Sequence, residues 1–406
     1  MAAAASLRPA NGKRWTELYP ELGTGPVPIE PYVSREYFER ERELIFRKVW
    51  LNIGRVELIP NPGDYFVKEL PVCNTSILIV RGKDSVIRAF HNMCSHRGNK
   101  IVADRSGNCP GLFTCKFHGW AFGLDGALRH ITDEASFFNL DQSTLGLVPV
   151  AVDTWQGFIF INVDPKPGES LREYLGAIGD GFEGYPFGEL AATRFSYDTE
   201  LKANWKVLKD AFQEVWHIPT LHHKSIPGVF SDGDNRWGHA LEFKLYERHG
   251  RVSLPGNFAR KPTPIEAVAV RYGAGATVIK SAQNVLPPGV NPTRDPSWSI
   301  DGNALFPNCL LYVAGETYLT HTFWPISENR TLWEIRFYYP QATTLAQRFS
   351  QEYAKVMLRD VNLEDGSTLE RTQTMLESGA RKQIFLQDQE LLIRHHHWVA
   401  EKYLNS

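Results

Sequence analysis

The stretch "CSHRGNKIVADRSGNCPGLFTCKFH", residues 94–118, decides how the first half of the chain is interpreted. It opens with a Cys-x-His pair, Cys94 and His96. It closes with a Cys-x-x-His pair, Cys115 and His118. Thiolates and imidazoles are both ligands of transition metals, so this alternating order predicts a metal centre.

Two kinds of centre use two Cys and two His. Structural zinc accepts any such mixture, but its common modules pair two close cysteines and then two close histidines, or use four cysteines. In a Rieske [2Fe–2S] centre, one iron takes both thiolates and the other takes both imidazoles. Two loops that each supply one Cys and one His match that division. Gly98 and Gly119 follow the two pairs closely and allow backbone to approach a cluster, so the pattern favours the Rieske centre over zinc.

The composition excludes several broad classes of protein. The 406 residues are 43% hydrophobic and 22% charged, which is typical of a soluble globular protein with one large domain or two. A net charge of −2 gives no reason to expect nucleic acid or an anionic membrane as a partner. The start, "MAAAASLRPANGKRW", lacks the apolar core of a signal peptide, and no apolar run is long enough to span a membrane. Five cysteines do not make a disulfide framework, so we expect the reducing cytoplasm.

The pattern of short runs predicts an α+β protein in three parts. Residues 1–44 predict a helical segment that packs on the larger domain. Residues 45–165 contain short runs such as "SILIV" and "GFIFINV" between Gly, Pro, Asn and Asp, which indicate an all-β domain. "DPKPGES" marks the junction. Residues 166–406 mix strands with helices and end in a helical tail.

A second motif, "NWKVLKDAFQEVWHIPTLHH", has the apolar spacing of a helix. On one continuous helix, Asp210, Glu214 and His217 fall at i, i+4 and i+7 and share a face. Pro219 is expected to end or bend that helix.

The bend at the proline allows His222 to return beside His217. Two His with a distant carboxylate form the facial triad of non-haem Fe(II) oxygenases, which leaves positions open for O2. His223 is the alternative second ligand, although the spacing favours His222. The other interpretation is a helix whose buried His and acidic side chains are satisfied by hydrogen bonds.

Together the two motifs resemble a known family. "CSHRG…CKFHGWAFGLDGAL" resembles the Rieske domain of the Rieske non-haem iron oxygenases, and "WQGFIFINVDP" lies within the same resemblance. Glu214-x-x-His-x-x-x-x-His resembles the family's Asp-x-x-His-x-x-x-x-His. Respiratory Rieske proteins carry an additional disulfide, but Asn99 and Phe117 occupy those positions here. The resemblance is therefore to the alpha (catalytic) subunit of enzymes like the aromatic-ring-hydroxylating dioxygenases.

The resemblance implies a fold and a set of ligands. The fold is an all-β Rieske [2Fe–2S] domain followed by a catalytic domain with an antiparallel sheet of the helix-grip type and a mononuclear iron. The third iron ligand comes from a helix near the C-terminus, which "NLEDGSTLERTQ" resembles. Asp365 matches the ligand position, with Glu364 and Asp360 as alternatives.

The resemblance also gives Glu214 a role. In the family, an acid at this place bridges a cluster histidine of one subunit to an iron-ligand histidine of the next. Here the bridged pair would be His118 and His217. A head-to-tail homotrimer follows, to which a small β subunit is added in some members. Asp210 is a weaker candidate for a supporting role at the same iron.

The implied activity is that of a terminal oxygenase in a multicomponent system. It would use O2, with electrons that reach it from NAD(P)H through a separate ferredoxin or reductase, because no GxGxxG fingerprint follows a strand. We expect hydroxylation or dihydroxylation of a hydrophobic small molecule, aromatic or polycyclic. The alternative is a monooxygenase or demethylase for a quaternary amine or methyl ether, which the Glu at position 214 supports. A pure electron carrier and a zinc-stabilised binding protein are the rival classes.

The remaining Cys and His residues are expected to be structural. Cys73 and Cys309 are interpreted as core residues, and Cys109 as an ordinary loop thiol. "RHHHW", which contains His395 to His397, is expected to lie on the surface of a charged terminal helix.

Overall fold

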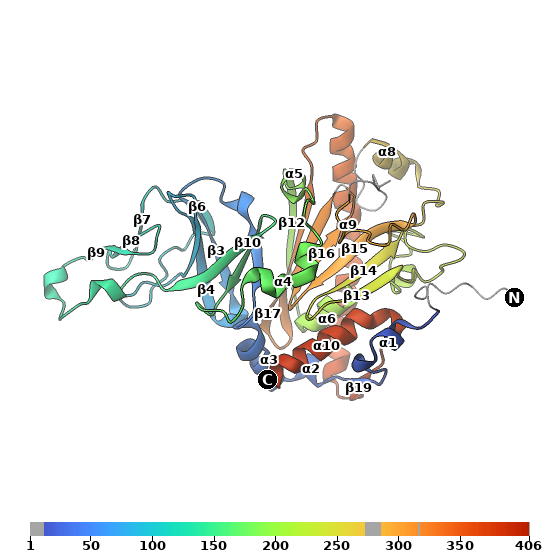
Figure 1. Cartoon of the computed structure of the whole chain (residues 1–406), viewed down its shortest axis with the longest axis horizontal. Coiled ribbons are helices and arrows are strands. Elements are labelled where there is room, and N and C mark those ends of the chain that lie inside the picture. Colours follow the sequence, from blue (N-terminus) through green and yellow to red (C-terminus); the bar gives the residue numbers. More distant parts are fainter. Residues whose placement is uncertain (1–11, 273–285, 316, 406) are drawn as a thin grey trace. The chain divides into compact units, whose positions relative to one another are not determined.

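A computed structural model describes residues 12–272, 286–315 and 317–405 (Figure 1). The chain divides into two compact units: one is Arg42–Tyr174, and the second combines Met1–Glu41 with Leu175–Ser406. The first eleven residues, on which the prediction about a signal peptide rests, lie outside the described residues. Among the helices that the structure describes, not one combines the length and the apolar character needed to cross a bilayer.

The unit 42–174 is built from two antiparallel sheets. The larger has the order β2-β11-β10-β5-β4-β3-β6 and the smaller the order β7-β8-β9. Their strands are β2 (Leu51–Arg55), β3 (Asp64–Leu70), β4 (Thr75–Arg81), β5 (Ile87–His91), β6 (Ser106–Asn108), β7 (Leu112–Thr114), β8 (Ala121–Gly123), β9 (Leu128–His130), β10 (Pro149–Trp155) and β11 (Phe158–Asn162). Short helical turns connect them, namely η2 (Arg42–Phe46), η3 (Val56–Leu58), η4 (Pro71–Cys73), η5 (Glu134–Ser136) and η6 (Gln142–Thr144). β4 is buried along most of its length, which explains its run of Ile, Leu and Val.

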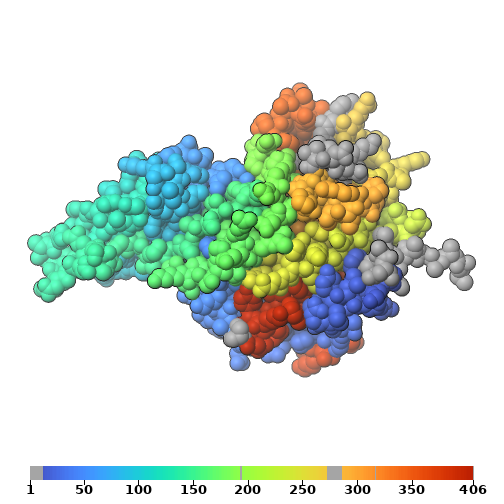
Figure 2. Space-filling model, in the orientation of Figure 1, coloured from blue at the N-terminus to red at the C-terminus, as the bar shows by residue number. Residues whose placement is uncertain are grey.

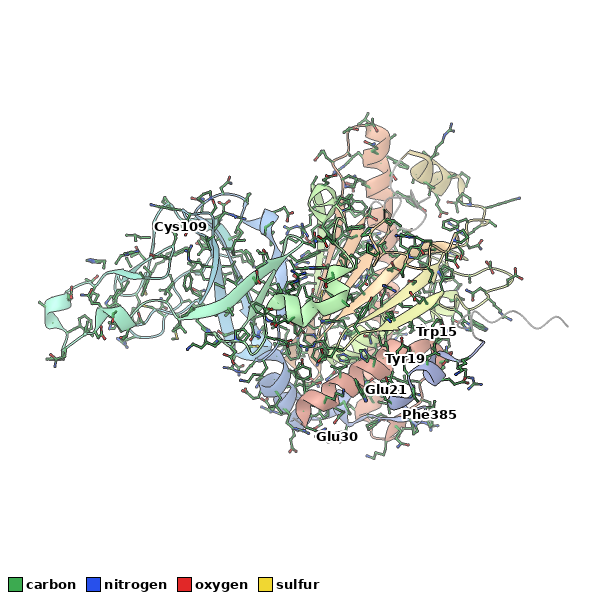
Figure 3. All side chains as sticks on the ribbon, viewed as in Figure 1. Trp15, Tyr19, Glu21, Glu30, Cys109 and Phe385 are labelled. Carbon is green, nitrogen blue, oxygen red and sulfur yellow. The ribbon has the colours of Figure 1, made fainter. Side chains whose placement is uncertain are left out.

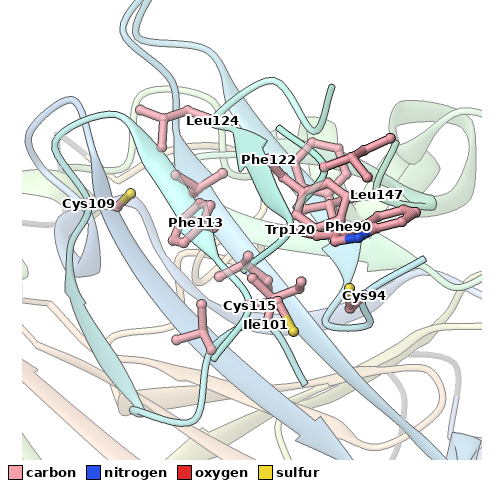
Figure 4. Close-up of a cluster of buried hydrophobic side chains, with 14 residues drawn as sticks. Phe90, Cys94, Ile101, Cys109, Phe113, Cys115, Trp120, Phe122, Leu124 and Leu147 are labelled. Atoms are coloured by element: carbon pink, nitrogen blue, oxygen red, sulfur yellow. The ribbon is translucent and has the colours of Figure 1, made fainter. Parts of the chain in front are cut away.

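An apolar cluster joins the two sheets and reaches the loops of the Cys-His motif (Figure 4). It includes Phe90, Trp120 and Phe122, together with the thiols of Cys94 and Cys115. Both thiols are 2% exposed, so this end of the core includes the sulfur atoms. Cys109, expected as a loop thiol, is also buried in the cluster (Figures 3 and 4).

The second unit is organised around one antiparallel sheet of seven strands. Its order is β12-β18-β17-β16-β15-β14-β13. The strands are β12 (Thr193–Leu201), β13 (Glu242–Leu245), β14 (Gly250–Pro255), β15 (Trp298–Leu305), β16 (Cys309–Val313), β17 (Tyr318–Ser327) and β18 (Arg330–Tyr339). The helices are α1 (Trp15–Leu18), α2 (Glu30–Val33), α3 (Arg35–Glu41), α4 (Leu171–Asp180), α5 (Phe187–Leu190), α6 (Trp205–Ala211), α7 (Ile218–Leu221), α8 (Pro264–Tyr272), α9 (Leu345–Glu377) and α10 (Leu391–Leu404). The short elements η1 (Pro20–Leu22), η7 (Asp388–Glu390), β1 (Val27–Pro28) and β19 (Gln383–Ile384) complete the set, and β1 pairs with β19.

The N-terminal segment packs against the last helix of the same unit. Tyr37 of α3 donates a hydrogen bond to Glu401 of α10 at 2.6 Å, and Arg394 donates to the carbonyl of Gly25 at 2.8 Å. Figure 2 shows the two segments together, in blue and red. Trp15, which Figure 3 labels, adds an edge-on contact with Phe243 of the sheet, with ring centroids 5.3 Å apart.

Two local predictions are wrong. The helix that was to carry Asp210, Glu214 and His217 on one face ends at Ala211, and the chain turns before α7 begins at Ile218. The residues His395 to His397 lie in α10 as expected, but all three are buried rather than on the surface. They face Lys209, Tyr32 and other groups of the core, so a charged sequence here does not mean an exposed helix.

Candidate metal centres

The two Cys-His loops have the same backbone design. In one loop, the N–H of Gly98 donates to the carbonyl of Cys94 at 2.9 Å; in the other, the N–H of Gly119 donates to the carbonyl of Cys115 at the same distance. The φ angles of the two glycines are 74° and 75°, in the left-handed region that glycine adopts most readily. The matched turns present one Cys and one His from each loop.

The side chains of these loops divide into two sulfurs and two rings. His96 and His118 have ring centroids 4.6 Å apart, and His96 stacks on Trp120 at 5.1 Å. The rings are half-buried while the thiols of Cys94 and Cys115 are buried. The arrangement matches a cluster with a buried thiolate side and a partly exposed imidazole side.

The second loop also stabilises a thiolate at Cys115, whereas burial raises the pKa of the Cys94 thiol in the first loop. Burial raises the pKa of the Cys115 thiol, but the backbone N–H of Phe117 and the side-chain amide of Asn99 outweigh it, so the pKa is lowered overall. The Asn99 amide lies 3.6 Å from the sulfur. Hydrogen bonds to sulfur are among the factors that set the potential of a Fe–S cluster. The residues present therefore fit a [2Fe–2S] group.

A second group of ligands lies in the other unit. His217 and His222 stand at the two ends of α7, and Asp365 comes from the middle of α9. One ligand atom from each residue lies within 4.8 Å of the others. Nε2 of His222 is 3.1 Å from Oδ1 of Asp365, and Nε2 of His217 is 3.7 Å from the same oxygen.

The carboxylate of Asp365 shows that this group suits a metal. Its side chain is 2% exposed, and neither oxygen is in hydrogen-bonding geometry with another residue that the structure describes. A buried carboxylate without hydrogen bonds is costly unless a cation satisfies it. Two imidazoles and one carboxylate on one side of a metal are typical of non-haem iron with open positions.

Both histidines are oriented by acids behind them. Nδ1 of His217 contacts the carboxylate of Glu214, and Nδ1 of His222 lies 2.8 Å from Oε2 of Glu364. Ser225 donates to the same oxygen of Glu364 at 2.6 Å. A proton held on each Nδ1 leaves each Nε2 free to bind a metal.

The alternative ligands have other partners. His223 is exposed, and its Nδ1 lies 2.8 Å from the carbonyl of Thr220. Asp360 pairs with Arg359 on the surface of α9. Glu364 orients His222, as described above, a role that the sequence reasoning did not consider. The adjacent acids at 364 and 365 could have indicated this role: neighbouring positions of a helix point in different directions, so only one of the two can be the ligand and the other can contact a different group.

Asp210 belongs to a separate network. Its carboxylate accepts a hydrogen bond from Tyr32 at 2.6 Å, and the same hydroxyl lies 2.6 Å from Nε2 of His397. The structure therefore does not bring Asp210 together with Glu214 and His217 through a direct hydrogen bond among the described residues.

A cavity of about 110 Å³ adjoins the three ligands. Apart from the ligands themselves, most of its lining is apolar: Ala211, Phe212, Val215, Ile218, Ile226, Phe230, Leu254, Ile300, Leu319, Met357, Leu358 and Val361. Four polar residues also line it: Glu214, Tyr312, His321 and Asn362. The Tyr312 hydroxyl donates its proton to the carbonyl of Phe212.

Comparison with protein families decides how the two centres are classified. The model of the ring hydroxylating alpha subunit (catalytic domain) matches residues 189–406, more than half of the chain. The chain belongs to the Rieske non-haem iron oxygenases, as an alpha subunit. A model of the Rieske [2Fe-2S] domain also matches, over residues 49–150. The expected α+β fold and the expected enzyme class are confirmed, against the electron-carrier and zinc-protein alternatives.

Individual relatives of this alpha subunit include components of carnitine monooxygenase and of naphthalene dioxygenase. The carnitine monooxygenase oxygenase subunit of Escherichia coli (strain K12) is 33% identical over 237 residues, 58% of this chain and 59% of the relative. The large oxygenase component of the naphthalene 1,2-dioxygenase system of Pseudomonas aeruginosa is 36% identical over 201 residues, 48% of this chain and 43% of the relative. The chain thus spans about three fifths or less of the length of these relatives.

A solved structure covers nearly the whole alpha subunit. It is a quaternary ammonium Rieske monooxygenase, studied for carnitine oxidation and inter-subunit electron transfer. The TM-score is 0.72 at 23% identity, over 93% of this chain and 95% of that one. At this identity the likeness supports the fold.

Proposed function

We propose that this alpha subunit is the terminal oxygenase of a multicomponent system that hydroxylates a small molecule with O2. A separate ferredoxin or reductase supplies the electrons, which originate in NAD(P)H. The [2Fe–2S] cluster is held by Cys94, His96, Cys115 and His118, and the mononuclear Fe(II) by His217, His222 and Asp365. The names of the relatives, "oxygenase subunit" and "large oxygenase component", support a role as one part of a larger system.

The observation that carries this proposal is the buried carboxylate of Asp365 beside two oriented imidazoles and an apolar cavity. When bound, the ferrous ion supplies open positions at which O2 is activated, and the cluster supplies electrons. The residues of the chain do the rest. Glu214 and Glu364 hold the imidazoles in one tautomer, and the apolar walls exclude water from the reacting atoms.

Glu214 is proposed to carry a second role as the bridge for electrons. Its Oε1 contacts Nδ1 of His217, and its Oε2 accepts a hydrogen bond from the backbone N–H of His217 at 3.2 Å, so a further partner would bind an oxygen that already accepts one hydrogen bond. In a head-to-tail homotrimer that partner is His118 of a neighbouring copy. Sedimentation of the purified protein tests the assembly: three times the 46.1 kDa chain is expected, and additional mass would indicate a small β subunit.

A quaternary amine is the substrate class we propose first. The match to the carnitine monooxygenase subunit is the longer of the two sequence matches, and Glu occupies position 214. A trimethylammonium group needs no hydrogen-bond acceptor and is bound well by aromatic rings, and Phe212 and Phe230 belong to the lining of the cavity. The three carboxylates of Glu214, Glu364 and Asp365 outweigh the two positive charges of Fe(II), so a cation is not repelled.

An aromatic or polycyclic substrate is the second candidate, and it was the first expectation from sequence. The apolar lining of the cavity and the naphthalene-dioxygenase relative support it.

Metal analysis followed by a single turnover tests the function. We expect about three irons and two sulfides per chain and a Rieske EPR signal after dithionite reduction. The reduced protein is then mixed with O2 and carnitine, choline or naphthalene, with Asp365→Ala as the matched control. Oxygen in an amine product from the wild type alone supports the first candidate, and oxidised naphthalene alone supports the second. Zinc without sulfide would refute the whole proposal.

We also propose that the protein works in the cytoplasm. The five cysteines form no disulfide with one another in the described chain, as in proteins of reducing compartments. Cell fractionation, with an enzyme of the cytoplasm as the marker, tests the location.

A further inference from the structure

His321 is a buried polar residue on the wall of the cavity, and the proposed function gives it no role. It lies in β17 and faces the same side as Leu319, two positions earlier, and both residues line the cavity. Its side chain packs against Phe212 and Tyr312, with ring centroids 4.7 Å and 5.6 Å away. It is 4% exposed, so any hydrogen bond that it lacks has an energetic cost.

One neighbour fixes which nitrogen of His321 carries the proton. The indole Nε1–H of Trp333 donates to Nδ1 of His321 at 3.1 Å. An indole nitrogen is only a donor, so Nδ1 must be the acceptor and the proton of the neutral ring is on Nε2. Burial lowers the pKa of His321 to about 3, which keeps the ring neutral at physiological pH.

The Nε2–H group is left without a partner among the described residues. Trp333 is the one hydrogen-bond partner of His321 in the described chain, and it occupies the other nitrogen. The hydroxyl of Tyr312, which also lines the cavity, donates to the carbonyl of Phe212 instead. Asn362 offers a second polar group in the lining, from α9 rather than the sheet.

We propose that His321 determines substrate specificity: its Nε2–H donates a hydrogen bond to an oxygen of the substrate, at a distance from the carbon that is oxidised. The substrate class is thereby narrowed to molecules that combine an apolar or methylammonium part with a hydroxyl, carbonyl or carboxylate oxygen. This inference rests on the proposed function, because it takes the cavity beside Asp365 as the substrate site. A neutral donor suits a cationic substrate, since a protonated imidazole would repel it.

The same contact should make the site reject substrate analogues that lack the oxygen. A ligand without the oxygen would bury the Nε2–H group unpaired, and sites built to bond a polar substrate group discriminate strongly against analogues that lack it. Trp333 is then a positioning residue, because it acts on the substrate only through the tautomer of His321.

Matched ligand pairs test the inference on the holoenzyme. One pair is choline and propyltrimethylammonium, and the other is indan-1-one and indane; in each pair one member lacks the oxygen. Dissociation constants are measured by calorimetry for the wild type, His321→Phe, His321→Gln and Trp333→Phe. Leu319→Val, in the same strand and cavity, is the control.

The expected result is a change in a ratio, which a loss of folding would not imitate. The wild type and Leu319→Val bind the oxygen-bearing member about tenfold more tightly, from one neutral hydrogen bond. The ratio falls to about one in His321→Phe, recovers partly in His321→Gln, whose amide can donate, and is intermediate in Trp333→Phe. A tenfold ratio that persists in His321→Phe overturns the inference.

The two pairs separate this inference from the proposed substrate class. Binding of the indanone pair alone, with the ratio lost in His321→Phe, removes the amine as substrate and leaves the role of His321 intact. If the amine pair binds and His321→Phe does not change the ratio, the amine remains the proposed substrate class and the role of His321 is refuted. If neither pair binds, a crystallographic fragment screen decides: an acceptor atom within about 3 Å of Nε2 is expected in bound fragments, and apolar groups against Nε2 overturn the inference.

Discussion

The Cys-His loops and the His-His-Asp group are assembled in opposite ways. The first group comes from two adjacent loops with the same turn, closed in each case by a glycine at φ near 75°. The second needs the two ends of the four-residue helix α7 and the middle of the long helix α9. A local site depends on backbone conformation, whereas a site of distant parts depends on packing and on the acids that orient its ligands.

The largest expected effect comes from removing the carboxylate of the His-His-Asp group. Asp365→Ala should lower turnover roughly a thousandfold, equivalent to about 4 kcal/mol, because the iron is lost with its ligand. Iron should fall from about three to two per chain while sulfide and the Rieske EPR signal stay unchanged. Glu364→Gln is the matched control and should keep most of the iron. An unchanged iron content in Asp365→Ala would identify another residue as the ligand.

Histidines outside both centres should affect the pH dependence of stability rather than metal binding. Burial, with a smaller effect of Lys209, lowers the pKa of His395 to about 4, against about 6.5 in the unfolded chain. Between these values the unfolded state binds more protons, so stability is present above pH 6.5 and is lost as the pH falls toward 4. His395 should account for about 3 kcal/mol of the stability lost by pH 4, so His395→Gln should lose about that much less than the wild type, while the buried His321 and His396, whose pKa values are also lowered, contribute to both curves. Unfolding by denaturant, measured at several pH values, gives the two curves; parallel curves would contradict the assignment.

The acid behind His217 tests whether orientation matters as much as ligation. Glu214→Gln should lower turnover about 10- to 100-fold, the usual effect of losing an acid that orients a metal ligand. Iron and cluster contents should remain near those of the wild type. Rapid-mixing spectroscopy should show slower oxidation of the reduced cluster, which would follow if Glu214 also carries electrons. Normal cluster oxidation with slow product formation would restrict its role to orienting His217.

The two glycines allow a direct comparison between the matched loops. Alanine at either position costs about 1–2 kcal/mol for its left-handed conformation. At Gly119 a Cβ would also lie 2.6 Å from Oγ1 of Thr132, whereas at Gly98 it meets nothing within 4 Å. Gly119→Ala should therefore lower the midpoint of thermal unfolding further than Gly98→Ala. Equal shifts would mean that Thr132 moves aside freely.

The smallest effect should come from the hydrogen bond that lies furthest from the metal position in the His-His-Asp group, the bond from Ser225 to Glu364. Ser225→Ala removes the donor to Glu364 and should weaken iron binding only several-fold, since a single hydrogen bond contributes about 1 kcal/mol. Competition with a chelator measures the change. A loss as large as that of Asp365→Ala would show that Glu364 leaves His222 when its hydroxyl partner is removed.

The sequence predicts these two sites to different degrees. The loop residues could be proposed from spacing and glycines alone, because the pattern is local. His217 and His222 could be paired across Pro219, but the helix before them was drawn too long, since nothing in the spacing shows that it ends at Ala211. Asp365 could be chosen over Glu364 only by resemblance.

Packing accounts for what sequence patterns could not show. The role of Glu364 depends on which face of α9 meets α7, and the burial of His396 and His397 depends on contacts with Lys209 of α6 and Tyr32 of α2. Both are contacts between residues far apart in the chain. Patterns within a short window contain no information about them.

Helix α9 carries three apolar lining residues of the cavity, Met357, Leu358 and Val361, on the turns that precede Asp365. Each is an apolar side chain whose replacement changes the shape of the chamber but not the position of the ligand, because the helix backbone is held by its own hydrogen bonds. Single-codon changes at these positions would let a lineage move to new compounds while it keeps the same metal. Substrate preference can thus change through the lining residues of this helix while the metal ligand on the same helix stays the same.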